Sequence, residues 1–121
     1  RLPPLAPDVL ALRMDAALDF ASSAALELYV HETLALRPEV RHVFIDAQPI
    51  NSIDITGIEA FTRLSHRLQV QDMHLHLSGL KLPVEQALQR AQALTPSPHL
   101  HLYRTHALAL QTLQAPVPSG M

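Results

Sequence analysis

The sequence contains no cysteine, and only three of its 121 residues are glycine. Without cysteine, the chain cannot form disulfides, thiol nucleophiles or thiolate metal sites. The three glycines, Gly57, Gly79 and Gly120, are too few and too far apart for a P-loop or for the G-x-G-x-x-G pattern of dinucleotide-binding folds. Nucleotide binding through a glycine-rich phosphate cradle is therefore excluded.

Basic residues are also scarce. The nine Lys and Arg residues, of which Lys81 is the only lysine, are outnumbered by eleven Asp and Glu residues, and the formal net charge is −2. Because the basic residues are scattered and form no stripe, we expect no nucleic-acid partner. No apolar run approaches the roughly 20 residues that span a bilayer, and no signal peptide is visible. This stretch of chain is therefore predicted to be soluble.

The composition indicates one globular domain with irregular ends. Hydrophobic residues make up 48% of the chain, and 121 residues suffice for one core. Residues 1–8 are rich in proline and predict a semi-rigid linker, residues 9–114 the domain, and residues 115–121 a disordered tail. The first residue is Arg1, which favours a segment that follows other residues in a longer protein.

Strand and helix patterns alternate along the chain. Apolar alternation and β-forming residues predict strands over 9–14, 17–20, 42–46, 73–77 and 99–103. Helical periodicity, caps and proline positions predict helices over 22–37, 57–70, 83–91 and 107–113. We expect the first two strands to form a β-hairpin and the later βα units to be parallel. The predicted class is α/β, with a mixed sheet of about five strands packed with about four helices.

The stretch from Val40 to Phe61 combines a buried strand, a polar loop and a helix start. His42 to Asp46 is a short run of β-forming residues, and Pro49 interrupts the pattern soon after it. Thr56 and Glu59 have the spacing of a capping box, which predicts a helix beginning near Gly57. A functional loop is expected between this strand and this helix, because open α/β sheets bind ligands and partners at the carboxyl ends of their strands.

Three segments in order carry a family resemblance. The run from Asn51 to Glu59 resembles the signature of STAS domains, the sulfate-transporter and anti-sigma-factor-antagonist modules. The segment Leu18 to Ser22 resembles that of STAS domains in SulP-type anion transporters, and Met73 to Lys81 with the following Pro83 resembles their next strand and helix start. These matches cover roughly residues 9 to 113, and they imply a STAS-like fold.

The resemblance gives Thr56 a specific role to test. In anti-sigma-factor antagonists the matching residue is a serine phosphorylated by a partner kinase. A phosphate at Thr56 would lie at a helix N-terminus, which favours negative charge, but Asp54 and Glu59 would repel it. The alternative is that Thr56 acts only as a helix N-cap. Ile55 departs from the antagonist pattern, which often has serine at that place.

The resemblance implies a non-catalytic regulatory and protein-interaction domain of a SulP-type anion (sulfate-like) transporter. It would lie at the cytoplasmic face of the inner (plasma) membrane, as part of a larger membrane protein. Its partners would be the transmembrane transport domain of the same chain and a cytoplasmic protein. One alternative is a free-standing anti-sigma-factor antagonist switched by phosphorylation at Thr56. A second alternative is a module that binds a nucleotide or a small anion.

The contact loop is predicted to consist of polar residues without an evident core role. These are Asn51, Ser52, Asp54, Thr56 and Gly57. No catalytic residue and no cofactor are expected, because the sequence supports no serine–histidine–acid arrangement. Asp46 and Asp54 could form a carboxylate pair for magnesium or acid–base chemistry, but we interpret them as turn caps.

Histidine is abundant, with eight residues. His74 with His76 and His99 with His101 repeat one pattern, and residues two apart on a strand share a face. If the two strands are neighbours, four imidazoles could converge as a zinc site or a pH-sensitive patch. The other interpretation is that histidine is a polar filler on a half-exposed sheet face. We favour the filler and predict no metal site.

Overall fold

The computed structural model describes residues 7–13, 17–18, 20–105 and 108. The elements alternate between strands and helices along most of the chain. The strands are β1 Val9–Arg13, β2 Ala17–Leu18, β3 His42–Asp46, β4 Ser52–Ile53, β5 His74–Ser78 and β6 Leu100–Tyr103. The helices are α1 Phe20–Leu36, α2 Ile55–Val70 and α3 Leu82–Arg90. The chain therefore has the α/β class that the sequence predicts.

Four strands form the main sheet in the order β1-β3-β5-β6, and β2 and β4 form a separate short pair. Every strand pair among the described residues is parallel. The two central strands β3 and β5 are the predicted strands at 42–46 and 73–77, the second shifted by one residue. Parallel neighbours require crossovers, and the helices between successive strands supply them.

The predicted β-hairpin is wrong for the strands that the structure describes. β1 pairs with β3, in a register that places Leu10 beside Val43, and β2 pairs with β4. The local sequence pattern identified both segments as strands, but a local pattern carries no information about the strand partner. The parallel register aligns the apolar side of β1 with that of β3. A hairpin of β1 with β2 would instead leave the edge of β3 that β1 now covers without a partner.

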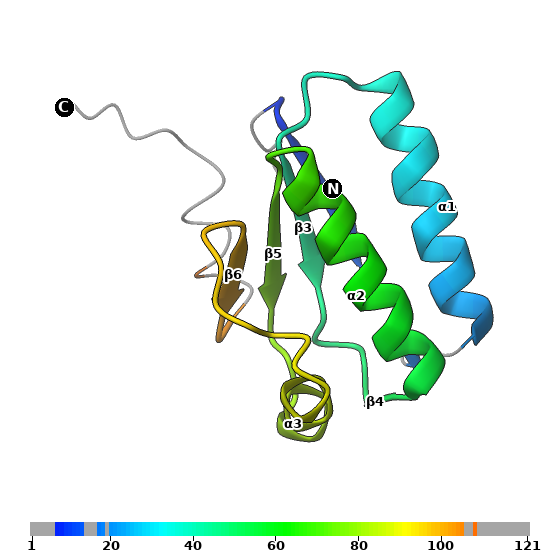
Figure 1. The fold of residues 1–121 in the computed structure, drawn as a ribbon, viewed down its shortest axis with the longest axis vertical. Coiled ribbons are helices and arrows are strands. Elements are labelled where there is room, and N and C mark those ends of the chain that lie inside the picture. The colour runs from blue at the N-terminus through cyan, green and yellow to red at the C-terminus, as the bar shows by residue number, and fades with distance from the viewer. Residues whose placement is uncertain (1–6, 14–16, 19, 106–107, 109–121) are drawn as a thin grey trace, which may run out of the picture.

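One face of the main sheet packs against helices and forms the core. α1 and α2 contact each other, and α2 lies against β5 (Figure 1). The helix-facing core residues of β1, β3 and β5 are Leu10, Val43, Ile45, Leu75 and Leu77, and Phe61, Leu64 and Leu68 of α2 belong to the same cluster. The spacing of the three α2 residues is that of one helix face, as the sequence predicts.

Two predicted helix starts are wrong. α1 begins at Phe20, so Phe20 does not end a strand, and neither Ser22 nor Ser23 is the cap. α2 begins at Ile55, two residues before the predicted start. The predicted helix at 107–113 lies outside the described residues except Leu108, whose N–H donates to Thr105 Oγ1 at 3.2 Å. The segments 1–6 and 115–121 also lie outside the described residues.

The third helix lies beyond the carboxyl ends of β3 and β5 and contacts β4 (Figure 1). Pro83 lies in its first turn, as predicted, where its missing N–H removes no hydrogen bond. α3 therefore flanks the same end of the sheet as the loop that the sequence singles out. Within the described residues, no helix is long and apolar enough to cross a membrane.

Candidate functional site

The loop between β3 and α2 is fixed by hydrogen bonds within the loop and by one to β5. Asp46, the last residue of β3, accepts the N–H of Gln48 on its Oδ1 at 3.0 Å. Ala47 donates its N–H to Ser78 O of β5 at 2.9 Å, and Ile50 donates its own to Ala47 O at 3.0 Å. These bonds form a tight turn at the carboxyl edge of the sheet. The predicted turn-cap role of Asp46 agrees with this geometry.

Gly79 allows this turn to approach β5. Its φ of 72° lies in the left-handed region, where residues with a Cβ are disfavoured. A Cβ added at Gly79 would lie 3.1 Å from Gln48 Cβ and 3.4 Å from Gln48 Cα. Glycine is therefore required at this position both by the backbone conformation and by the nearby loop.

Asp54, and not Thr56, is the N-cap of α2. Asp54 Oδ1 accepts the N–H of Gly57 at 2.8 Å, and Asp54 O accepts the N–H of Ile58 at 2.9 Å. The predicted capping box of Thr56 and Glu59 is therefore wrong. Aspartate is a strong N-cap residue, and Asp54 stands directly after β4. The extended segment that pairs with β2 therefore ends two residues before the position that the capping box requires.

Lys81 lies beside the predicted contact loop, which the sequence did not reveal. Its Nζ donates a hydrogen bond to Asn51 Oδ1. Lys81 is the N-cap residue of α3 and follows β5, so parallel pairing of β3 and β5 brings its backbone to the edge where the loop begins. The signal that could have located this contact is the position of Lys81 shortly after β5, the strand that pairs with β3. The loop therefore carries one cation among its exposed polar groups.

The predicted contact residues differ in exposure. Asn51, Ser52 and Asp54 are exposed, Thr56 is partly buried, and Gly57 is buried. Gly57 therefore contributes its backbone N–H, which Asp54 already occupies. Beside them Ile55 exposes 72% of its surface, which is unusual for an isoleucine. The loop thus presents polar groups and one large apolar side chain together.

A shallow hollow of about 670 Å³ continues from Ile55 along α2. Its lining comes from α2 and from Ala91, and includes Ile58, Glu59, Thr62 and Arg63. Arg63 also binds both carboxylate oxygens of Glu27 in α1, at 3.1 and 2.8 Å. The hydrogen bond from Arg63 lowers the pKa of Glu27. This ion pair joins the two helices next to the loop.

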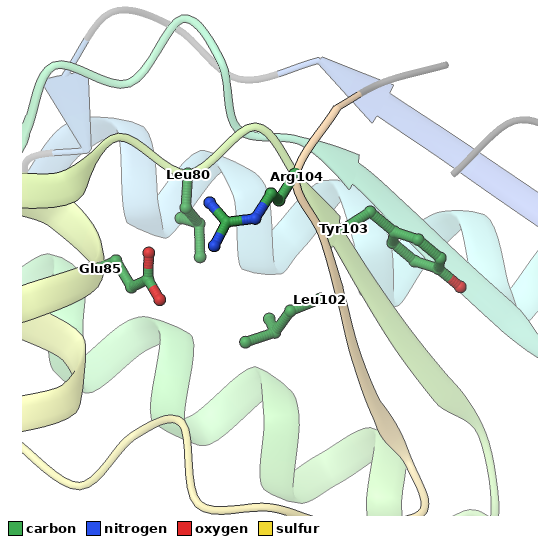
Figure 2. A pocket seen from close by; sticks show the side chains of 5 residues that line it. All are labelled: Leu80, Glu85, Leu102, Tyr103 and Arg104. Carbon is green, nitrogen blue, oxygen red and sulfur yellow. The ribbon is translucent and has the colours of Figure 1, made fainter. Parts of the chain in front are cut away.

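A second hollow, of about 240 Å³, lies between α3 and β6 (Figure 2). Its lining residues are Leu80, Glu85, Leu102, Tyr103 and Arg104. Four of these side chains surround the hollow, whereas the ring of Tyr103 points away from it (Figure 2). The hollow therefore presents one carboxylate and one guanidinium, a pair that suits a small dipolar ligand better than a simple anion.

The two predicted histidine pairs meet on the sheet. β5 and β6 are neighbours, and His76 is in register with His101. His42 of β3 joins them, in register with His74. We call His42, His74, His76, His99 and His101 the histidine face, because they lie on the side of the sheet opposite the helix-facing core residues. No group of three or more histidine, aspartate or glutamate side chains in the described residues has the arrangement of a metal site.

Comparison with known proteins gives one family match. The family model described as STAS domain matches residues 4–109. High affinity sulfate transporter 2 of Stylosanthes hamata is 28% identical over 82 residues, and Sulfate transporter 1.2 of Arabidopsis thaliana is 30% identical over 84 residues. These alignments cover 60% and 62% of this chain but only 12% and 13% of the transporters. The chain thus spans about an eighth of their length.

Two solved structures share the fold. The SulP transporter STAS domain from Vibrio cholerae superposes with a TM-score of 0.70 at 18% identity, covering 93% of this chain and 83% of that one. A protein from Thermotoga maritima assigned as an anti-sigma factor antagonist gives a TM-score of 0.69 at 13% identity, covering 91% and 92%. At these identities the likeness concerns the fold alone.

Proposed function

Because the chain belongs to the STAS domain family, we propose that it is a non-catalytic regulatory domain that docks other proteins through the β3–α2 loop. The observation that carries this function is the exposed surface of that loop. Asn51 and Ser52 are exposed and take no part in the core cluster, and Ile55 beside them exposes 72% of its surface. Polar groups around an exposed apolar side chain are typical of a protein contact surface.

The partner we propose first is the membrane domain of a SulP-type anion transporter, in the same polypeptide. Two sulfate transporters are related to this chain over 82 and 84 residues. In such a protein the domain would lie at the cytoplasmic face of the membrane, and the loop would contact either the transport domain or a cytoplasmic regulator. The cation of Lys81 beside Asn51 favours a partner surface that includes an acceptor or a carboxylate.

The second candidate is a free-standing antagonist that a kinase phosphorylates at Thr56. It is supported by the fold shared with the Thermotoga maritima protein. Against it, Thr56 is partly buried, and the Asp54 carboxylate already bonds to the first turn of α2. A phosphate on Thr56 would meet that carboxylate, and Lys81 is bound to Asn51. A nucleotide or small anion would meet the same carboxylate at this helix terminus, so we rank that function third.

The test replaces Thr56 by glutamate in the full-length protein. We expect Thr56→Glu to reduce anion transport at least fivefold, because a second negative charge beside Asp54 changes the surface that the partner meets. The free energy of unfolding of the domain should change by no more than about 1 kcal/mol, since helix N-termini tolerate negative charge. Thr95→Glu is the control for the same chemical change, because Thr95 is an exposed threonine in the loop between α3 and β6.

Three outcomes separate the candidates. Loss of transport in Thr56→Glu with normal transport in Thr95→Glu supports docking through the loop. Normal transport in both variants removes the loop from the regulatory mechanism. Mass spectrometry of the protein isolated from its own cells adds the third outcome, because phosphate on Thr56 in a protein without transport activity would favour the antagonist.

A further inference from the structure

The histidine face contains two hydrogen-bonded pairs of imidazoles. His42 Nδ1 and His76 Nε2 are 2.9 Å apart, and His74 Nδ1 and His101 Nε2 are 3.0 Å apart. A hydrogen bond between two ring nitrogens needs one nitrogen without a proton to accept it. Each pair can therefore take up one proton and keep its bond, but a doubly protonated pair must separate. The rings of His76 and His101 also stack with centroids 4.5 Å apart, so charge on both would repel.

This face attaches the edge strand β6 to the rest of the sheet. Among the described strands, β6 pairs with β5 alone, and its four residues are half-buried or exposed. Side chains add three contacts to the backbone ladder. They are His101 with His74, Tyr103 OH with His76 Nδ1 at 2.9 Å, and His99 Nε2 with Asp72 Oδ1 at 2.9 Å. All three contacts involve an imidazole of the histidine face, and in the first two the donor and acceptor roles of the ring nitrogens depend on the tautomer.

Carboxylates lie close enough to balance the positive charge of a protonated imidazole at the rim of the histidine face, but not at its centre. Asp8, ahead of β1, lies 3.9 Å from His42 Nε2, and Asp72, ahead of β5, bonds to His99. In the described residues no ion pair reaches His76 or His101. Two further charged groups of the described residues are near: Asp46 lies on the same side of β3, and Arg41 precedes β3 and its charge acts on Asp72.

We propose that the histidine face is a pH-operated latch, in which neutral imidazoles hold β6 on β5 and mild acid releases the strand. The inference does not depend on the docking role of the β3–α2 loop. The pKa shifts of two of these histidines have the direction that such a latch requires. Burial, followed by the charge of neighbouring histidines, lowers the pKa of His76 to about 3, and burial likewise lowers the pKa of His101. Both imidazoles therefore bind protons more readily when β6 is released.

Hydrogen exchange of named amides tests the latch. Leu75 donates its N–H to His99 O and Gly79 donates its own to Tyr103 O, so both amides report on the β5–β6 pair. Ala47, which donates to Ser78 O, and Arg41, which donates to Asp8 O, report on the rest of the sheet. Protection factors, corrected for the intrinsic rate at each pH, are measured at pH 7.5 and 5.0 with EDTA present.

We expect the protection of Leu75 and Gly79 to fall at least tenfold more than that of Ala47 and Arg41 between these pH values. Release returns the pKa of such an imidazole to near 6.5. Below that pH, each imidazole then raises the equilibrium constant for release by up to about tenfold per pH unit. Equal losses at all four amides would mean that the whole domain loosens together. That result would overturn the latch.

Two double variants separate the latch from a general effect of histidine. His74→Gln with His101→Gln replaces one pair by amides that can still hydrogen-bond to each other but cannot titrate. In this variant, the loss of protection at Leu75 and Gly79 in excess of the other two amides should shrink at least threefold. The control, His31→Gln with His66→Gln, changes two exposed helical positions and should keep the full excess loss. Should the first double variant not fold, His101→Gln alone, on the edge strand, should give a smaller reduction of the same sign.

Three further results would overturn the proposal. The first is unchanged pH dependence in the His74 and His101 variants. The second is the same loss of pH dependence in the His31 and His66 control. The third concerns metal: if equimolar zinc without EDTA protects Leu75 and Gly79 more than tenfold at pH 7.5, the face is a metal site and its response to pH reflects metal release.

Discussion

The two faces of the main sheet are built from the same strands but from different chemistry. Along β3 and β5, Val43, Ile45, Leu75 and Leu77 face the helices and are at most 3% exposed. The intervening positions carry His42, Phe44, His74 and His76. The first set contains no group that titrates, whereas the second contains three. The difference implies that one face supplies stability at any pH, while the contribution of the other depends on pH.

At the centre of the sheet, burial does not distinguish the two faces. His76 is 3% exposed, the same as Leu77 beside it in β5. The distinction lies in how burial is compensated, because a buried imidazole needs hydrogen bonds and an apolar side chain does not. Both ring nitrogens of His76 have partners, namely His42 and Tyr103. The histidine face is therefore as tightly enclosed as the core at this point, but its stability rests on a network that acid can break.

The largest effect is expected from the helix-facing side. Leu77→Ala should lower the free energy of unfolding by about 2–5 kcal/mol, the range for truncating a buried leucine. Leu36→Ala is the control, because Leu36 exposes 83% of its surface at the end of α1 and should change stability by less than about 0.5 kcal/mol. Denaturant titration at pH 7.5 measures both. A loss below about 0.5 kcal/mol for Leu77→Ala would show that the faces are assigned the wrong way round.

The next effect belongs to the histidine face and depends on pH. Burial lowers the folded-state pKa of His76 to about 3, below its ordinary value of 6.5, so the folded protein favours the neutral imidazole. Its stabilisation is fully present above the unfolded pKa of about 6.5 and is lost as the pH falls toward the folded value. Between pH 7.5 and 5.5 we expect a loss of about 1 kcal/mol from this residue.

Denaturant titration of two variants at pH 7.5 and 5.5 tests whether the pH dependence of stability belongs to the histidine face. His76→Gln should reduce the loss of stability between pH 7.5 and 5.5, although the variant will be less stable than the wild type at pH 7.5. Leu77→Ala should shift the stability at both pH values and leave the difference between them unchanged. An undiminished pH dependence in His76→Gln would assign it to other groups and would remove the contrast between the faces.

The fold was largely predictable because its determinants are local. A short run of β-forming residues located β3, alternation located β5, and helical spacing found the core face of α2. Strand partners were not predictable, because β1 and β2 have the same local pattern whether they pair with each other or with β3 and β4. The sequence also suggested that His74, His76, His99 and His101 could meet, but not that His42 joins them, since that contact depends on the register of β3 with β5.

The candidate site was predictable as a place and less so in its details. The contact residues from Asn51 to Gly57 follow β3 as expected, but they do not form a single loop, because they include β4 and the first residues of α2. The sequence pattern favoured Thr56 as the cap over Asp54, two residues earlier, and this choice was wrong because the helix start depends on where the β2–β4 pair ends. Lys81 was missed because its contact with Asn51 joins residues 30 positions apart.

The smallest effects concern how α2 is anchored on the apolar face, and they decide between those two caps. Asp54→Ala should lower the free energy of unfolding by about 1 kcal/mol, because Gly57 N–H loses its acceptor at 2.8 Å. Thr56→Ala should change it by less than about 0.5 kcal/mol, since alanine is favourable in the first turn of a helix and no cap is lost. Denaturant titration at pH 7.5 compares the two, and repeating it at pH 5.5 should give the same differences, because neither change touches the histidine face. If Thr56→Ala costs more than Asp54→Ala, the capping box is the real helix start, and the first turn of α2 in solution differs from the one described here. If either difference grows in acid, the helix-covered side shares in the pH response, and the contrast between the two faces of the sheet is lost.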